Sequence, residues 1–157
     1  LKCTKEMKET IIILLLLFTT ACYPSSTLEG PFNATRAIDG DTLELSTKEK
    51  VRLSGIDTPE KDECYYKEAK QRLSELVAGK QVYLERDYTN KDKYHRLLRY
   101  VYVGNNEVNV ILVEKGYARV YDKYAYDTKK YKRLKDIETL AVREGRGIWS
   151  CLNESNI

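Results

Sequence analysis

The sequence predicts one small domain of the α+β class, mainly β, built as a five-stranded barrel with three helices. Three observations predict it. The chain has 157 residues, which suits a single domain with short extensions. Short segments that alternate apolar and polar residues come first and are interrupted once by a helical repeat. Hydrophobic residues make up 42% and charged residues 32%, a composition that supports a packed core and excludes global disorder.

Five segments carry the alternation of strands. They are Ala34 to Ile38, Thr42 to Ser46, a segment containing Val51 and Leu53, Gln81 to Asp87, and Leu97 to Val103. The Asp39-Gly40-Asp41 turn signal separates the first two segments. The third segment ends at Thr58-Pro59, because proline cannot donate a hydrogen bond to a strand ladder.

Three segments carry the period of helices. The first begins near Tyr66, where Ala69, Leu73, Leu76 and Val77 form one apolar stripe before Gly79. The others run from Asn109 to Lys115 and from about Thr128 to Glu144. The order of three strands, a helix, two strands and two helices is typical of the OB-fold and differs from the βαββαβ order of a ferredoxin-like sandwich.

The first residues resemble an export signal. Ile11 to Phe18 is an unbroken apolar run, too short for the roughly 20 residues that span a bilayer, and small residues follow it. A buried core strand is the alternative. We therefore expect a signal peptide at 1–21, with 1–6 as an upstream extension before Met7, then a tether at 22–32, the folded domain at 33–151 and a tail at 152–157.

The four cysteines give two expectations. Thr-Thr-Ala-Cys resembles a bacterial lipobox, in which Cys22 would carry the lipid, whereas ordinary cleavage after Ala21 would release the protein. The chain is therefore expected to be exported, as a membrane-anchored lipoprotein or as a secreted or periplasmic protein. Lipidation of Cys22 would leave Cys64 and Cys151 as an even pair, either a disulfide in an oxidising compartment or two buried thiols.

Charged residues interrupt the apolar pattern at the ends of the strands. Asp41 and Asp57 lie on successive strand segments, and two carboxylates with a carbonyl favour Ca²⁺ or Mg²⁺. Arg52, inside a strand, suits phosphate recognition or a cross-strand salt bridge. A single histidine excludes a histidine-rich zinc site, and the absence of a CxxC pair excludes a zinc knuckle. The formal net charge of +3 is too small to identify a binding partner.

Four strings in this order resemble the staphylococcal nuclease family, over roughly Asn33 to Cys151. They are AIDGDTLEL, VRLSGIDTPE, DKYHRLLRYV and VNVILVEKGYARV. The resemblance implies an OB-fold barrel and Ca²⁺-dependent hydrolysis of phosphodiester bonds in DNA and RNA.

The resemblance also implies roles for individual residues. Asp41 and Asp57 match the calcium carboxylates, Thr58 the position that lends its carbonyl, Glu60 the general base, Arg52 and Arg96 the phosphate-binding arginines, Lys93, Tyr94 and Tyr124 positions beside the bound nucleotide, and Asp39 an acidic neighbour of the metal. One position departs from the family pattern: His95 stands where a glycine is usual, so a positive φ there would be strained.

Together these expectations describe a monomeric, calcium-dependent nuclease of low sequence specificity that cleaves the bond to the 5′-oxygen. Its substrates would be single-stranded DNA and RNA, with double-stranded DNA as a further candidate. The alternative is an OB-fold lipoprotein that binds nucleic acid without cutting it. The combination of Asp41, Arg52, Asp57, Glu60 and Arg96 favours the enzyme, because a pure binding protein does not need that set.

Overall fold

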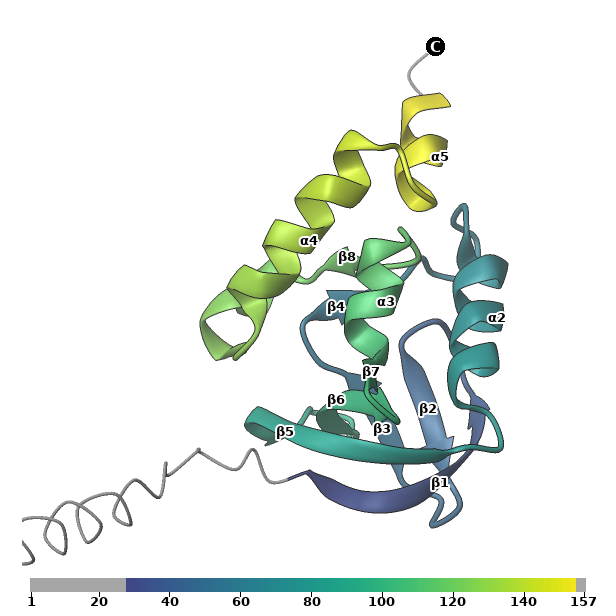
Figure 1. Cartoon of the computed structure of the whole chain (residues 1–157), viewed down its shortest axis with the longest axis vertical. Helices are drawn as coiled ribbons and strands as arrows, with labels where there is room; N and C mark the ends of the chain where they lie inside the picture. The colour runs from purple at the N-terminus through teal and green to yellow at the C-terminus, as the bar shows by residue number, and fades with distance from the viewer. Residues whose placement is uncertain (1–27, 155–157) are drawn as a thin grey trace, which may run out of the picture.

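The structure, a computed structural model, describes residues 28–154 (Figure 1). The expected signal peptide, Met7, Cys22 and the first part of the tether lie outside the described residues. Among residues 28–154, none of the helices has the length and apolar character needed to cross a bilayer.

Five strands form a closed barrel, which confirms the predicted fold class. They are β1 (Glu29–Ala37), β2 (Thr42–Leu45), β3 (Lys50–Leu53), β5 (Gln81–Lys91) and β6 (Leu97–Val103). Their order is β3-β2-β1-β5-β6, with every neighbouring pair antiparallel. A parallel pairing of β3 with β6, in which Val51 faces Leu97, closes the barrel. Closure leaves no long unpaired edge among these strands.

Apolar side chains fill the barrel and the space beneath its helices. Leu43 and Leu45 on β2 and Val51 and Leu53 on β3 are fully buried, as their alternation predicts. The helix α2 (Tyr66–Val77) packs on β1 through the buried Ala69, Leu73 and Val77, and Leu76 lies half-buried on its flank. Gly79 follows the helix with φ +71°, a left-handed conformation that favours glycine.

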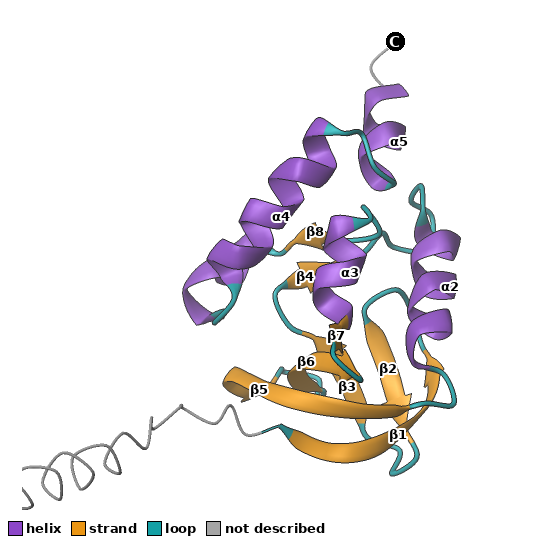
Figure 2. Cartoon of the chain, in the orientation of Figure 1, coloured by secondary structure: helices purple, strands orange, loops and turns teal. Residues whose placement is uncertain are grey.

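The other helices gather at one end of the barrel (Figure 2). They are α3 (Val108–Glu114), α4 (Tyr131–Arg143) and α5 (Ile148–Glu154). Between the barrel and α4 lies a two-stranded ribbon of β4 (Ile56–Asp57) and β8 (Arg119–Val120), in which Asp57 faces Arg119. This ribbon places Asp57 beside the end of β3.

Several elements differ from the sequence-based expectation. β1 begins at Glu29, inside the expected tether, because Glu29 to Asn33 pairs with β5. The strands β4, β7 (Asn106–Glu107) and β8 are too short to show alternation, and the 3₁₀ segment η1 (Asp122–Asp127) and α5 lack a clear apolar stripe. The last long helix starts at Tyr131 rather than near Thr128, whose side chain instead bonds the carbonyl of Tyr124.

A disulfide joins Cys64, in the loop before α2, to Cys151 in α5. The two residues are separated by 87 positions in the chain. Because the loop after Pro59 also carries Glu60, the bond fixes the far end of a segment that belongs to the candidate site. It also holds α5, which lies beyond α4 at the end of the molecule away from the barrel (Figure 1).

Removing this bond should destabilise the fold. The double variant Cys64→Ser/Cys151→Ser should lose about 2–4 kcal/mol of unfolding free energy, because a cross-link over a long loop restricts the unfolded chain. Urea denaturation of the oxidised protein and of the variant measures the difference. Wild type treated with reductant is the control and should match the variant; a loss below about 1 kcal/mol would contradict the expectation.

Candidate functional site

A cavity of about 530 Å³ opens beside the barrel, between the turns of β2, β3 and β4 on one side and the β5–β6 hairpin and η1 on the other. All the residues expected to bind metal, phosphate or nucleotide line it: Asp39, Asp41, Arg52, Asp57, Thr58, Glu60, Lys93, Tyr94, Arg96 and Tyr124. The structure therefore brings together residues that span more than half of the described chain.

The turn before β2 places Asp41 at the bottom of this cavity. The Asp41 backbone N–H donates to Asp39 Oδ1 at 3.1 Å, and the Thr58 backbone N–H and Oγ1 both donate to Asp41 Oδ2 at 3.1 Å. Gly40 allows this approach, because a Cβ there would lie 2.6 Å from Thr58 Oγ1. The turn thus depends on glycine for close packing and holds Asp41 against the strand that carries Asp57.

The guanidinium of Arg52 lies between the two carboxylates. Its Nε is 3.0 Å from Asp41 Oδ1, and its Nη2 is 3.3 Å from Asp57 Oδ1. Its Nη1 donates to the carbonyls of Leu53 and Ile56, both at 2.7 Å. Four anchors therefore fix the side chain, so the position of its charge is set before any substrate arrives.

Burial makes the charge on Asp41 unfavourable. Asp41 is 6% exposed, and burial raises the pKa of its carboxyl to about 6, against the opposing effect of the Arg52 guanidinium. The neighbouring charge of Asp39 raises it further, and hydrogen bonds from Thr58 and Thr42 lower it. A further positive charge beside Asp41 would therefore stabilise the ionised form of its carboxyl.

These donors fit a hard divalent cation. Two carboxylates and the carbonyl of Thr58 offer only oxygen, which suits Ca²⁺ or Mg²⁺ rather than zinc. Both carboxylates already converge on one positive group, the guanidinium of Arg52. Within residues 28–154, no group of three or more His, Cys, Asp or Glu side chains is placed to hold a metal, so the two aspartates would need carbonyl and water ligands.

The β5–β6 hairpin carries the second arginine. Asp92 Oδ1 accepts the backbone N–H groups of Tyr94 and Arg96 at 2.9 and 3.0 Å, and Asp92 Oδ2 accepts Arg96 Nε at 2.7 Å. Arg96 Nη1 also donates to Thr42 Oγ1 at 3.3 Å, and Thr42 in turn donates to Asp41. His95 has φ +64°, in the left-handed region where the family pattern has glycine, and Arg96 is nevertheless directed into the cavity.

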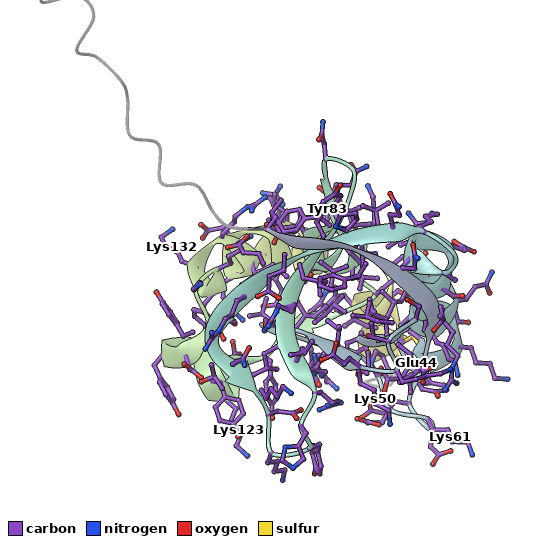
Figure 3. All side chains as sticks on the ribbon, turned by 90° about the horizontal axis from the view of Figure 1, so that it is seen from below. Glu44, Lys50, Lys61, Tyr83, Lys123 and Lys132 are labelled. Atoms are coloured by element: carbon purple, nitrogen blue, oxygen red, sulfur yellow. A yellow bond between two sulfur atoms is a disulfide. The ribbon has the colours of Figure 1, made fainter. Side chains whose placement is uncertain are left out.

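Aromatic and basic side chains form the rim. Tyr94 and Tyr124 are 66% and 45% exposed, with Lys93 Nζ 4.9 Å from the ring centre of Tyr94 and Lys123 Nζ 5.8 Å from that of Tyr124. In Figure 3, Lys123 and Lys61 project at two corners of the same edge of the molecule, away from Tyr83. Exposed rings next to cations suit the stacking of bases along a phosphate backbone.

The sequence patterns assigned no role to four residues that contribute to this geometry: Thr42, Glu63, Asp92 and Arg119. Asp92 orders the hairpin, and Arg119 Nε lies 3.2 Å from Asp57 Oδ2. Asp92 is the first residue of the DKYHRLLRYV string, so its position before a turn was a usable signal. Arg119 stands inside the VNVILVEKGYARV string, but its pairing with Asp57 depends on two strands of two residues each, which are too short to show alternation.

Comparisons with known proteins identify the family to which this sequence is similar. The sequence model of the family described as staphylococcal nuclease homologue matches residues 50–151. The chain is 33% identical over 147 residues to an uncharacterized endonuclease of Haemophilus influenzae, covering 91% of this chain and 79% of that protein. It is 31% identical over 156 residues to a thermonuclease of Staphylococcus hyicus (89% and 91% covered) and 31% identical over 127 residues to a micrococcal nuclease of Shigella flexneri (73% and 71%). The predicted resemblance is confirmed.

Neutralising Asp41 should stabilise the metal-free protein at neutral pH. The folded-state pKa near 6 exceeds the ordinary 3.8, so the folded chain binds more protons between these values and stability falls as pH rises from about 4 to 6. Asp41→Asn should therefore be about 1–3 kcal/mol more stable than wild type at pH 7 and about equal to it at pH 4.

Urea denaturation in chelator across this pH range measures the difference. Asp136→Asn, on an exposed residue paired with Lys132, serves as the control and should differ from wild type by a nearly constant amount. A difference for Asp41→Asn that stays constant with pH would refute the assigned role of burial.

Proposed function

The chain belongs to the staphylococcal nuclease homologue family and is a nuclease that hydrolyses phosphodiester bonds of nucleic acids; we propose that it requires Ca²⁺, acts on DNA and RNA, and cleaves the bond to the 5′-oxygen with low sequence specificity. One observation carries the proposal. Asp41 and Asp57 converge on Arg52 at the bottom of a cavity that Glu60 and Arg96 also line.

Asp41, Asp57 and the Thr58 carbonyl would hold the cation. Bound Ca²⁺ supplies positive charge that offsets the charge of the phosphodiester. The protein contributes a carboxylate that is already buried and oriented by Thr42, Thr58 and Arg52. Because the strands fix these groups, little reorganisation is needed when the substrate binds.

Glu60 and the two arginines would carry the hydrolysis. Glu60, exposed at the mouth of the cavity, accepts a proton from water as the water oxygen bonds to phosphorus. The bond from phosphorus to the 5′-oxygen breaks, so one product keeps the phosphate and the other gains a 5′-hydroxyl. Arg52 and Arg96 stabilise the negative charge that grows on the phosphoryl oxygens, and Arg96 donates toward the leaving oxygen.

Nucleotides on either side of the cleaved bond would lie along the rim. Tyr94 and Tyr124 offer exposed faces for base stacking, and Lys93 and Lys123 offer charge to the backbone. Stacking accepts every base, which supports low sequence specificity. It also favours single strands, in which the base faces are accessible, over double-stranded DNA.

The calcium requirement and the catalytic set can be tested together. Wild type should cleave a fluorophore-labelled single-stranded DNA with Ca²⁺ and lose cleavage in chelator. Glu60→Gln and Arg52→Ala should each lower kcat about 10²–10³-fold, because each removes a group that acts in the transition state. Lys132→Ala, at an exposed surface position of α4, is the matched control.

Two results would contradict this proposal. Undiminished cleavage in chelator would remove the metal requirement. Salt-dependent binding of DNA without turnover, with Ca²⁺ present, would favour the binding protein that was the alternative function. The charged set around Arg52 argues against that outcome, since binding alone does not need Glu60.

We further propose that the protein is exported, with lipidated Cys22 as its membrane anchor. The apolar run at Ile11 to Phe18 and the Thr-Thr-Ala-Cys string support this proposal, and the disulfide suits an oxidising compartment. Mass spectrometry of the protein from membranes of an expressing bacterium should show an N-terminal Cys22 with acyl chains. A free N-terminus at Cys22 would refute the anchor and indicate release.

A further inference from the structure

We propose that Arg119 is a positioning residue that couples Asp57 to the loop bearing Glu60; this inference rests on the proposed function. Arg119 faces Asp57 directly across the β4–β8 ribbon. Its Nε lies 3.2 Å from Asp57 Oδ2, while Arg52 holds Asp57 Oδ1. The two oxygens of Asp57 are thus fixed by different arginines, which sets the orientation of the carboxylate.

The same guanidinium reaches the loop that follows Pro59. Arg119 Nη2 lies 3.4 Å from Glu63 Oε2, and this oxygen accepts the backbone N–H of Glu60 at 2.8 Å. A second bond closes the turn, because the Glu63 N–H donates to the Glu60 carbonyl at 2.8 Å. A continuous path therefore runs from Asp57 through Arg119 and Glu63 to the backbone of Glu60.

Exposure of the pair shows why its effect should lie in catalysis rather than in stability. The side chains of Arg119 and Glu63 are 41% and 50% exposed, and exposed ion pairs add little to the stability of a fold. A displacement of a catalytic group by about 1 Å, by contrast, can lower a rate about 10²-fold. The disulfide at Cys64 fixes the next residue of the loop, so the path through Arg119 holds the part nearer the cavity.

Steady-state kinetics on labelled single-stranded DNA with Ca²⁺ test this coupling. Arg119→Ala and Glu63→Ala should each lower kcat about ten- to a hundredfold with KM nearly unchanged, because the rim that binds nucleotides is intact. The double variant should be no slower than the slower single variant, since both break one path. Arg119→Lys keeps the charge without the fork and should recover part of kcat.

Two measurements separate positioning from a structural role. Hydrogen exchange of the Glu60 amide in the metal-free protein should be faster in Arg119→Ala than in wild type, while the thermal midpoint changes by no more than about 4 °C. Arg72→Ala breaks a comparably exposed pair with Glu75 on α2 and should change neither kcat nor this exchange rate.

The outcomes also distinguish this inference from the proposed function. If wild type cleaves and Glu60→Gln does not, but Arg119→Ala keeps its kcat, only the coupling is wrong. A change confined to KM would overturn it too, because Arg119 would then contact the substrate. If wild type fails to cleave, the proposed function is wrong. An exchange rate of the Glu60 amide that is the same in Arg119→Ala as in wild type would refute the coupling independently of any cleavage.

Discussion

The ion pairs of Arg52 with Asp41 and Asp57 are the constraint on which the rest of the site depends. Without a cation, two carboxylates at the end of a barrel would repel each other, and one of them is buried. Arg52 offsets that repulsion and is itself anchored by two carbonyls. The cluster therefore holds the Arg52 guanidinium in a fixed position, while burial keeps the pKa of the Asp41 carboxyl raised in spite of this partner.

Barrel closure brings the two arginines to the same cavity. Arg52 lies on β3 and Arg96 immediately before β6, and these strands are parallel neighbours although 44 positions separate the two residues. The pairing of Val51 with Leu97 thereby sets the positions of Arg52 and Arg96 relative to each other along the two strands. The hydrogen bond from Arg96 to Thr42 adds a side-chain link across the same opening. The backbone pairing of β3 with β6 that closes the barrel is consequently also the contact that positions the two arginines.

The sequence predicted the parts of this arrangement that repeat or form motifs. Alternation located the strand cores and helical spacing located α2, because both patterns follow from which side chains are buried. The charged residues were found because they interrupt those patterns or match a family. No role was assigned to Arg119 or Glu63, although Arg119 stands inside a family-like string, because only the short β4–β8 ribbon places Arg119 beside Asp57 and only Arg119 links Glu63 to it.

The division between core and site explains how this fold can carry a strained and highly charged cavity. Apolar contacts in the barrel and under α2 supply the stability, so the cavity residues are free to be selected for charge and position. His95, with its positive φ, and the buried Asp41 both oppose stability locally. The disulfide adds stability, because it ties the loop beyond Glu60 to α5 and restricts the conformations that the exposed polar residues of this loop can adopt. The loop that bears Glu60 is thus held by a covalent bond at its far end and by the Arg119–Glu63 pair near the cavity, two restraints of different strength on one short segment.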